Sequence, residues 1–311
     1  MTPEAYSKQL KLPLETVYFK SLDDLKLKGY WFPHPTMASG KSVILGHGYT
    51  ANAGDMLALV KMYHELGYNA FLLNFRVHSG SAGKHSSIGY HEGKDIAGAL
   101  DYLKCHHREQ ANNITYHGHS MGAAAFLLAP KSLQEFPQAR NQLLKGIDSA
   151  ILDSSYHVIK PSDDPFVTRF TQMNAERKWY DRILNPIKSK LKVLVSAFEE
   201  QSKDLMQLPK PLTELYPAKI YAEAQDFHTK PLLIMHGAQD TRTPFAEGQA
   251  IYETLKASQA NVAPMATLAA DHAASRWKPT PKSGPYHSIL RDEVKYQSAV
   301  SQFLKTGHAS Q

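Results

Sequence analysis

The chain has 311 residues, of which 42% are hydrophobic, and its 35 basic and 29 acidic residues give a formal net charge of +6. This length suits one large α/β domain with an insertion, or two domains, and the apolar content suffices for a substantial core. The basic residues are scattered without a run of five, so we expect no nucleic-acid partner. The densest basic stretch, Lys188, Lys190 and Lys192, is interpreted as a solvated helix face.

Disulfide bonding and membrane insertion are also constrained by the sequence. Cys105 is the single cysteine, which excludes an intrachain disulfide. The first residues lack a basic segment followed by an apolar one, and no apolar run approaches about 18 residues. We therefore expect a cytoplasmic protein with no signal peptide and no transmembrane segment.

Short apolar runs typical of buried strands alternate along the chain with amphipathic runs typical of helices. In chain order, strands are predicted at residues 14–19, 25–32, 43–45, 70–73, 114–117, 150–152, 232–235 and 262–268. Helices are predicted at residues 55–66, 90–104, 123–129, 245–255 and 292–304. This alternation predicts an α/β fold with βαβ crossovers and a mostly parallel eight-stranded sheet flanked by helices, opened by an antiparallel hairpin.

A long segment without a predicted strand separates the sixth strand from the seventh. Apolar residues recur in it at helical spacing, first from Phe166 to Met173 and again from Ile183 to Phe198. We therefore expect a helical cap at residues 154–226, inserted into a core formed by residues 1–153 and 227–311. A cap at the carboxyl edge of the strands would lie over a ligand site. The residues expected to line its substrate pocket are Phe166, Phe170, Trp179 and Tyr180.

The most informative feature is the pentapeptide at residues 118–122, Gly-His-Ser-Met-Gly, which has the form G-x-S-x-G. A β-branched and aromatic run precedes it, and a helix-forming run follows it. That order predicts a strand, a sharp turn and a helix, with two glycines because the turn is tight and the central backbone is strained. The hydroxyl of Ser120 would then lie above the sheet edge, at a helix N-terminus that favours developing negative charge. The pattern predicts a nucleophilic serine.

A serine nucleophile needs a base, a carboxylate that orients this base, and donors for the oxyanion. Asp240 is the predicted carboxylate, because it follows a buried strand that ends in His-Gly. Two histidines come after the last predicted strand: His272 close behind it, and His287 directly before the final helix. Either histidine could supply the base from this last loop.

The predicted oxyanion donors are two backbone amides. Residues 46–50 read Gly-His-Gly-Tyr-Thr and follow the third predicted strand. Glycine lets the backbone approach the substrate, so the amide of Tyr49 is available to donate. The second donor is the amide of Met121, directly after Ser120. This set of residues implies neither a metal nor an organic cofactor.

At these residues the chain resembles the α/β-hydrolase superfamily, in its branch of single-domain esterases, lipases and serine-peptidase-like proteins. The resemblance rests on H-G-Y-T, G-H-S-M-G and H-G-A-Q-D, in the order serine, acid and histidine that this fold uses, and covers roughly residues 14–305. It implies that Ser120 attacks and that Asp240 holds the histidine. It favours His287 over His272, because residues 284–288 match the family-like G-x-x-H-S.

Two segments depart from the family pattern. Residues 74–81 read Asn-Phe-Arg-Val-His-Ser-Gly-Ser, where the family has D-x-R-x-H-G-x-S with a compact Arg-Gly-His-Gly. This puts the packing of that loop in question, but not the triad. The last loop is longer than usual, and residues 271–286 resemble an insertion. If they are not one, His272 takes the role of base.

These motifs predict a serine hydrolase that cleaves small-molecule or lipid-like carboxylic esters through a covalent acyl-enzyme. The same residues would serve a peptidase, an amidase or a thioesterase, because the pocket decides which bond is cleaved. A lipase at a membrane surface and a non-catalytic ligand-binding relative are further alternatives. The sequence indicates neither the acyl chain length nor the oligomeric state.

Overall fold

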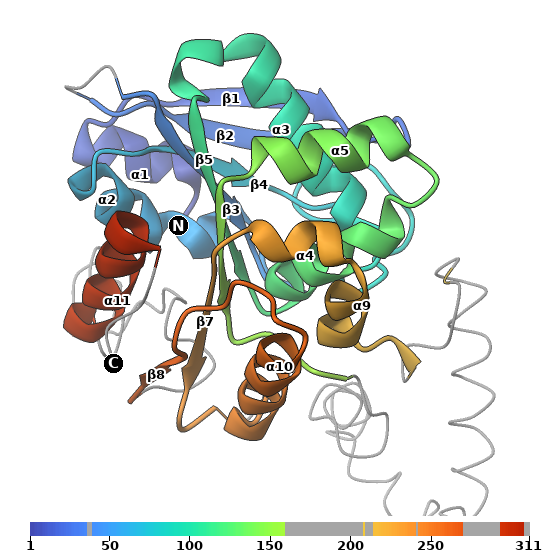
Figure 1. The fold of residues 1–311 in the computed structure, drawn as a ribbon. Coiled ribbons are helices and arrows are strands. Elements are labelled where there is room, and N and C mark those ends of the chain that lie inside the picture. The colour runs from blue at the N-terminus through green and yellow to red at the C-terminus, as the bar shows by residue number, and fades with distance from the viewer. Residues whose placement is uncertain (36–38, 159–207, 209–213, 241, 270–292, 308–311) are drawn as a thin grey trace, which may run out of the picture.

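A single mixed sheet organises the protein. The computed structural model describes residues 1–35, 39–158, 208, 214–240, 242–269 and 293–307. The sheet has eight strands in the order β1-β2-β4-β3-β5-β6-β7-β8 (Figure 1). They are β1 (Glu15–Lys20), β2 (Lys26–Phe32), β3 (Lys41–Gly46), β4 (Asn69–Leu73), β5 (Asn113–His119), β6 (Ser149–Asp153), β7 (Leu232–Gly237) and β8 (Ala266–Leu268). Strand β2 runs antiparallel to β1 and β4, and all the other pairs are parallel, which confirms the predicted fold class.

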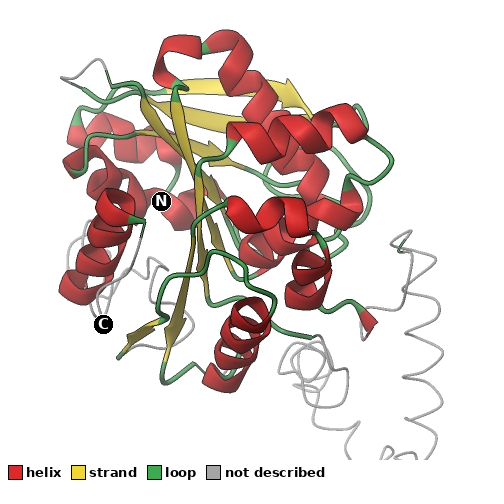
Figure 2. Ribbon diagram, viewed as in Figure 1, coloured by secondary structure: helices red, strands yellow, loops and turns green. Residues whose placement is uncertain are grey.

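Helices cover both faces of this sheet, as Figure 2 shows. One face carries α1 (Pro3–Leu10), α2 (Leu57–Glu65) and α11 (Glu293–Thr306). The other face carries α3 (Glu92–His106), α4 (Met121–Ser132), α5 (Pro137–Gly146), α9 (Pro217–Glu223) and α10 (Phe245–Ala257). Short 3-10 helices in the described part of the chain lie at Ala53–Met56, Arg108–Gln110 and Gln225–Thr229.

The central strands bury side chains on both faces, because each face is covered by helices. On β5, Tyr116 belongs to the core under α3 and α4. On β6, Ile151 belongs to the core under α2 and α11. Side chains alternate along a strand, and His119 pairs in register with Asp153, so these two residues share the face under α2 and α11. The sheet thus places polar side chains inside the molecule directly below its carboxyl edge.

The predicted strands agree with the structure except near the last one. The predicted strand at 262–268 is shorter, since β8 covers Ala266–Leu268 and Val262 forms an isolated bridge with Leu232. Pro264 lies between these two pairings, and proline cannot donate to a strand ladder. The predicted helix at 55–66 divides into a 3-10 turn and α2.

Among the helices of the described residues, three were not predicted. Helix α1 begins after Thr2, whose side chain accepts the N–H of Ala5 at 3.2 Å. Helices α1 and α5 each bury two residues, so their apolar periodicity is weak. Helix α9 has seven residues within the segment predicted as a cap, and its Tyr221 packs in the main core against Phe126 of α4. The cap boundaries at 154–226 stay a prediction, because residues 159–207 and 209–213 lie outside the described chain.

Candidate active site

Ser120 lies in a sharp turn between β5 and α4. Its backbone has φ 52° and ψ −114°, a left-handed conformation that non-glycine residues rarely adopt. A Cβ atom at Gly118 would lie 2.5 Å from the carbonyl carbon of Gly122. A Cβ at Gly122 would lie 2.4 Å from the carbonyl oxygen of Gly46 on β3. Both positions therefore require glycine, and the predicted order of strand, tight turn and helix is present.

The turn is fastened by hydrogen bonds on both sides. The N–H of Ser120 donates to the carbonyl of Asp153 at 2.8 Å, which extends the pairing of β5 with β6. The hydroxyl of Tyr116 donates to the carbonyl of Gly122 at 2.7 Å. The first bond of α4 joins the N–H of Ala124 to the carbonyl of Ser120 at 3.0 Å. The amide of Met121 thus lies in the first turn of the helix, where N–H groups precede the intrahelical ladder and the helix dipole is positive.

The loop after β3 lies directly against this turn. A Cβ at Gly48 would be 3.3 Å from the Cβ of Ser120 and 3.3 Å from Cδ2 of His119. Tyr49 follows Gly48, so its amide lies in the segment that approaches Ser120. The backbone at Gly48 therefore lies close to Ser120, and the role of the Tyr49 amide as an oxyanion donor stays a prediction.

His47 orients that loop, a role that its place in the His-Gly pair did not by itself indicate. The N–H of Phe75 donates to Nε2 of His47 at 3.1 Å, so Nε2 is the acceptor nitrogen. In the neutral ring Nδ1 then carries the proton, and it lies 2.8 Å from the carbonyl of Gly48. The C=O of Gly48 and the N–H of Tyr49 belong to one planar peptide and point in opposite directions. The buried imidazole thus directs the Tyr49 amide away from itself.

Asp240 lies beyond the end of β7, at the same edge of the sheet. Its Oδ1 accepts the N–H groups of Arg242 and Thr243 at 2.8 and 2.9 Å, and its Oδ2 accepts the hydroxyl of Thr243 at 2.8 Å. Nε2 of His236 lies 3.5 Å from Oδ2. The hydroxyl of Thr243 also contacts the carbonyl of Ser154 at 3.2 Å. The carboxylate is therefore buried in one orientation and tied to the end of β6.

The structure thus gathers Ser120, Met121, Tyr49 and Asp240 at the carboxyl ends of β3, β5 and β7. The two candidate bases, His272 and His287, fall between the end of β8 and the start of α11, outside the described residues. The four predicted pocket residues also lie outside the described residues, and so does the predicted helix from Ile183 to Phe198. Their roles stay predictions.

The loop after β4 supports the loop of Tyr49 from behind. Rings of His78 and His47 lie 4.9 Å apart between centroids, and those of His78 and Tyr49 lie 6.0 Å apart. His78 is therefore near the site. Val77 and Ser79 have φ values of 71° and 41°, and they stand where the family pattern has glycine.

Asn74 explains how this loop accommodates its departure from the family pattern. Its side chain is buried, Oδ1 accepts the N–H of Ala53 at 2.7 Å, and Nδ2 donates to the carbonyl of Ser79 at 3.1 Å. An aspartate could make the first bond but has no N–H for the second. The amide therefore replaces the usual carboxylate and closes the loop.

Arg76 is the charged centre of the same loop. Its guanidinium donates to both oxygens of Asp95 on α3, at 2.6 to 3.1 Å, and to both oxygens of Asp23, at 2.8 and 2.9 Å. The N–H of Arg76 also donates to Asp95 at 2.9 Å. Because the guanidinium is almost buried, these two carboxylates supply the partners that it requires. They tie the loop to α3 and to the turn between β1 and β2.

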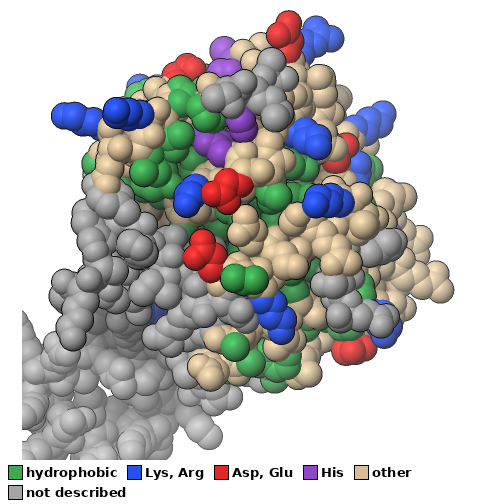
Figure 3. Space-filling model, turned by 90° about the vertical axis from the view of Figure 1, so that its left-hand side faces the viewer, with side chains coloured by type: hydrophobic (Ala, Val, Ile, Leu, Met, Phe, Trp, Pro, Cys, Tyr) green, Lys and Arg blue, Asp and Glu red, His purple; other side chains and the backbone are tan. Residues whose placement is uncertain are grey.

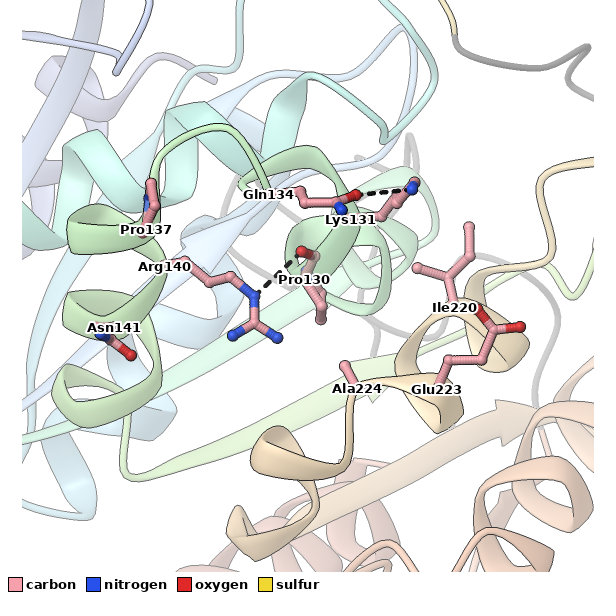
Figure 4. Close-up of a pocket in the computed structure, with 9 residues that line it drawn as sticks. All are labelled: Pro130, Lys131, Gln134, Pro137, Arg140, Asn141, Ile220, Glu223 and Ala224. Carbon is pink, nitrogen blue, oxygen red and sulfur yellow. Dashed lines mark hydrogen bonds between the residues drawn. The ribbon is translucent and has the colours of Figure 1, made fainter.

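A surface pocket of about 500 Å³ lies at the far end of α4, between α5 and α9 (Figure 4). Pro130 and Lys131 line it on α4, and a rise of about 1.5 Å per residue puts them roughly 15 Å from Ser120. Arg140 lies in the same pocket and is already paired with Asp226. This pocket is separate from the site at the carboxyl edge.

The described part of the chain contains neither a candidate metal cluster nor a candidate membrane-spanning helix. No group of three or more His, Cys, Asp or Glu side chains there could hold a metal ion. In the same residues, no helix is both long and apolar enough to cross a membrane.

Parts of the chain are similar in sequence to known proteins. A model of the prolyl oligopeptidase family matches residues 192–290, a segment that contains Asp240, His272 and His287. The uncharacterized protein YqkD of Bacillus subtilis is 35% identical over 105 residues, which are 33% of this chain and 32% of the relative. The uncharacterized protein Rv2307c of Mycobacterium tuberculosis is 29% identical over 108 residues, or 35% of this chain and 38% of the relative. Each match thus covers less than two fifths of the relative's length.

Solved structures match over nearly the whole chain. The Pyrococcus furiosus esterase Pf2001 is 24% identical, with a TM-score of 0.64 over 96% of this chain and 93% of that structure. An esterase from Thermogutta terrifontis is 14% identical, with a TM-score of 0.56 over 95% of this chain and 100% of that structure. XC6422 from Xanthomonas campestris, described as an α/β serine hydrolase without a lid, is 13% identical, with a TM-score of 0.53 over 96% of both chains. The chain therefore shares the fold of these solved hydrolases over nearly its whole length.

Replacing Asn74 by aspartate is expected to destabilise the protein. Asn74→Asp removes the donor to the carbonyl of Ser79 and sets a buried carboxylate oxygen against it. We expect the free energy of unfolding in urea to fall by about 2–4 kcal/mol. Asn141, which is exposed on α5, provides the matched control, and Asn141→Asp should change stability by less than about 0.5 kcal/mol. Equal effects of the two substitutions would contradict the role given to Asn74.

Asp23 is expected to make stability depend on acid pH. Burial alone raises the pKa of Asp23, but hydrogen bonds from Arg76 and Ser21 hold it at about 2, below the ordinary 3.8. The ionised carboxylate therefore stabilises the folded state above about pH 4, and this contribution disappears as the pH falls to about 2.

Urea unfolding between these two pH values measures the effect. Asp23→Asn should lose about 1 kcal/mol less stability than the wild type over this range, after allowance for the partial exposure of the carboxylate. Parallel pH profiles of wild type and variant would show that the Asp23–Arg76 pair contributes nothing in this range.

Proposed function

We propose that this protein is a serine hydrolase that cleaves carboxylic esters, with Ser120 as the nucleophile. The observation that carries the proposal is the backbone of Ser120, held at φ 52° between two positions where a side chain would clash. Such strain persists only where the surroundings impose it, and it is typical of functional sites. In a strand-to-helix turn it exposes a serine hydroxyl at the sheet edge.

The proposed reaction follows from the groups at that edge. Ser120 attacks the ester carbonyl while His287 accepts its proton and then returns it to the leaving alcohol. Asp240 holds the imidazole in the required orientation, and the amides of Tyr49 and Met121 stabilise the oxyanion. Water then repeats the cycle on the acyl-enzyme. These groups supply nucleophile, base and electrostatic stabilisation, so the reaction needs no metal or organic cofactor.

The ester class is supported by the names of the solved neighbours. Pf2001 and the Thermogutta terrifontis protein are called esterases, and both share the fold over most of their length. For this chain we propose a small or lipid-like ester, with Phe166, Phe170, Trp179 and Tyr180 lining the pocket and His272 as the alternative base. The pocket residues would determine which acyl chain is accepted.

A peptidase or amidase is the second candidate function. It is favoured by the match to the prolyl oligopeptidase family over residues 192–290. The same triad serves both reactions, and the pocket selects the bond. A membrane-surface lipase has less support, because Figure 3 shows basic and acidic side chains interspersed on the described part of the face that it displays.

Hydrolysis of p-nitrophenyl esters from acetate to palmitate, beside peptide p-nitroanilides, tests the proposal. Ser120→Ala and His287→Ala should each lower kcat by roughly 10⁴-fold or more, whereas His272→Ala should leave it within about 3-fold. Asp240→Asn should also be severely impaired, because the imidazole loses its orientation. Circular dichroism shows whether each variant is folded.

The possible outcomes are separate. Loss of activity in His272→Ala instead of His287→Ala would reassign the base and leave the mechanism intact. Cleavage of anilides in preference to esters would replace esterase by peptidase. Ester hydrolysis that survives in Ser120→Ala would contradict the proposed function.

A further inference from the structure

A chain of buried polar groups lies on the sheet face under α2 and α11, just below Ser120. The hydroxyl of Tyr63 on α2 lies 2.8 Å from Nδ1 of His117, and that of Tyr296 on α11 lies 2.9 Å from Nε2 of the same ring. Tyr296 donates its proton to Oδ2 of Asp153 at 3.2 Å. All four side chains are almost wholly excluded from solvent. The proposed triad uses none of them.

The proton positions in this chain are fixed by the carboxylate. A carboxylate only accepts, so Tyr296 donates to Asp153 and its oxygen accepts Nε2–H of His117. Nδ1 of the neutral ring then accepts the hydroxyl proton of Tyr63. Burial lowers the pKa of His117 to about 4, which agrees with a neutral ring. Every member thus has a defined donor or acceptor role.

Asp153 connects this chain to the nucleophile turn. Burial alone raises its pKa, but the hydrogen bond and charge of His119, with contributions from His117 and Ser154, hold the pKa well below its usual range. Nδ1 of His119 lies 3.4 Å from Oδ2 of Asp153, and the hydroxyl of Ser154 donates to Oδ1 at 2.9 Å. The backbone carbonyl of Asp153 accepts the N–H of Ser120 at 2.8 Å. One residue therefore contacts both Ser120 and the side chain before it.

His119 lies between this carboxylate and the oxyanion loop. Its Cδ2 would be 3.3 Å from a Cβ at Gly48, and its side chain is buried. His119 and Asp153 are paired in register on neighbouring strands. The imidazole therefore fills the space between Asp153 and the backbone that leads to Tyr49.

The geometry points to Asp153 and His119 as positioning residues for the reaction at Ser120. The buried carboxylate holds the imidazole, and the imidazole fixes the separation between the Ser120 turn and the Gly48–Tyr49 backbone. In this proposal both side chains act through the backbone of the turn and of the loop, not by contact with the substrate. The pair keeps the Tyr49 amide aligned with the carbonyl carbon that Ser120 attacks, which matters most when negative charge develops on the oxyanion. This inference rests on the proposed function.

A purely structural role would not require a charge. A buried carboxylate and its partner can usually be replaced by well-packed apolar residues without loss of stability. The strained turn at Ser120, in contrast, must be determined by its surroundings. The contact between Asp153 and His119 is directional and lies between the Ser120 turn and the Gly48 loop, so it can hold the strained turn in place.

The test compares Asp153→Asn, His119→Leu and His119→Gln with the wild type on the best p-nitrophenyl ester. Asp153→Asn and His119→Leu should lower kcat by about 10- to 100-fold and leave KM within about 2-fold. Inhibition by a trifluoromethyl ketone, which forms an oxyanion on the enzyme, should weaken by the same factor. His119→Gln keeps an N–H donor for Asp153 and should recover most of the lost rate.

Tyr63→Phe is the matched control at the opposite end of the buried chain. It removes the hydroxyl that donates a hydrogen bond to Nδ1 of His117, so the melting temperature should fall. The kcat should stay within about 2-fold of the wild-type value. If Asp153→Asn does not fold, the two His119 variants decide. Variants that are folded with unchanged kcat and unchanged ketone inhibition would overturn the inference, and so would equal loss in Tyr63→Phe. An inactive wild type would instead refute the proposed function.

Discussion

The backbone at Gly118 and Gly122, on the two sides of Ser120, has no room for a side chain, and the rest of the site depends on that constraint. The first turn of α4 passes so close to the ends of β3 and β5 that Gly118 and Gly122 cannot carry a Cβ atom. The helix therefore begins at the sheet edge itself, and Ser120 is forced into a left-handed conformation. A strained residue of this kind costs about 1–3 kcal/mol, which the packing and hydrogen bonds around it must offset.

Polar groups buried around the turn supply that support from three directions. His47 lies behind the Gly48 loop, Arg76 anchors the loop after β4, and Asp153 lies beneath the turn. Each has the partners that a buried polar group requires. Among the described residues, these groups link strands that are distant in sequence but adjacent in the sheet. The described part of the site is therefore held in place by buried polar groups.

The sequence revealed the architecture because the signals for it are local. Apolar runs indicated the strands, and residues 118–122 indicated the sharp turn at Ser120 through glycines that local crowding requires. The end of the sheet was predicted less well, because Pro264 divides a run that otherwise reads as one strand. Helices α1 and α5 were missed because each buries too few residues to produce a clear periodicity.

The buried polar groups that hold the site in place could not be predicted, because most of their contacts join residues that are far apart in the sequence. Asp153 reads in the sequence as the polar end of an apolar strand, and its partner Tyr296 is 143 residues away. His117 and Tyr116 point to opposite faces of β5. The sequence of the strand does not show that the face of His117 is the one covered by Tyr63 and Tyr296. Asn74 departs from the family pattern, and its reason is a carbonyl five residues along the loop. Only the folded sheet brings these groups together.

The most direct measurement of the central claim is the site of reaction with diethyl p-nitrophenyl phosphate. This reagent phosphorylates an activated serine and releases p-nitrophenolate. If the backbone preorganises Ser120 as a nucleophile, peptide mass spectrometry should find one diethylphosphoryl group, on Ser120, after treatment of the folded protein. Protein that is denatured by heat before the reagent is added should carry none. A folded protein that does not react, or that reacts equally when Ser120 is replaced by alanine, would contradict this account.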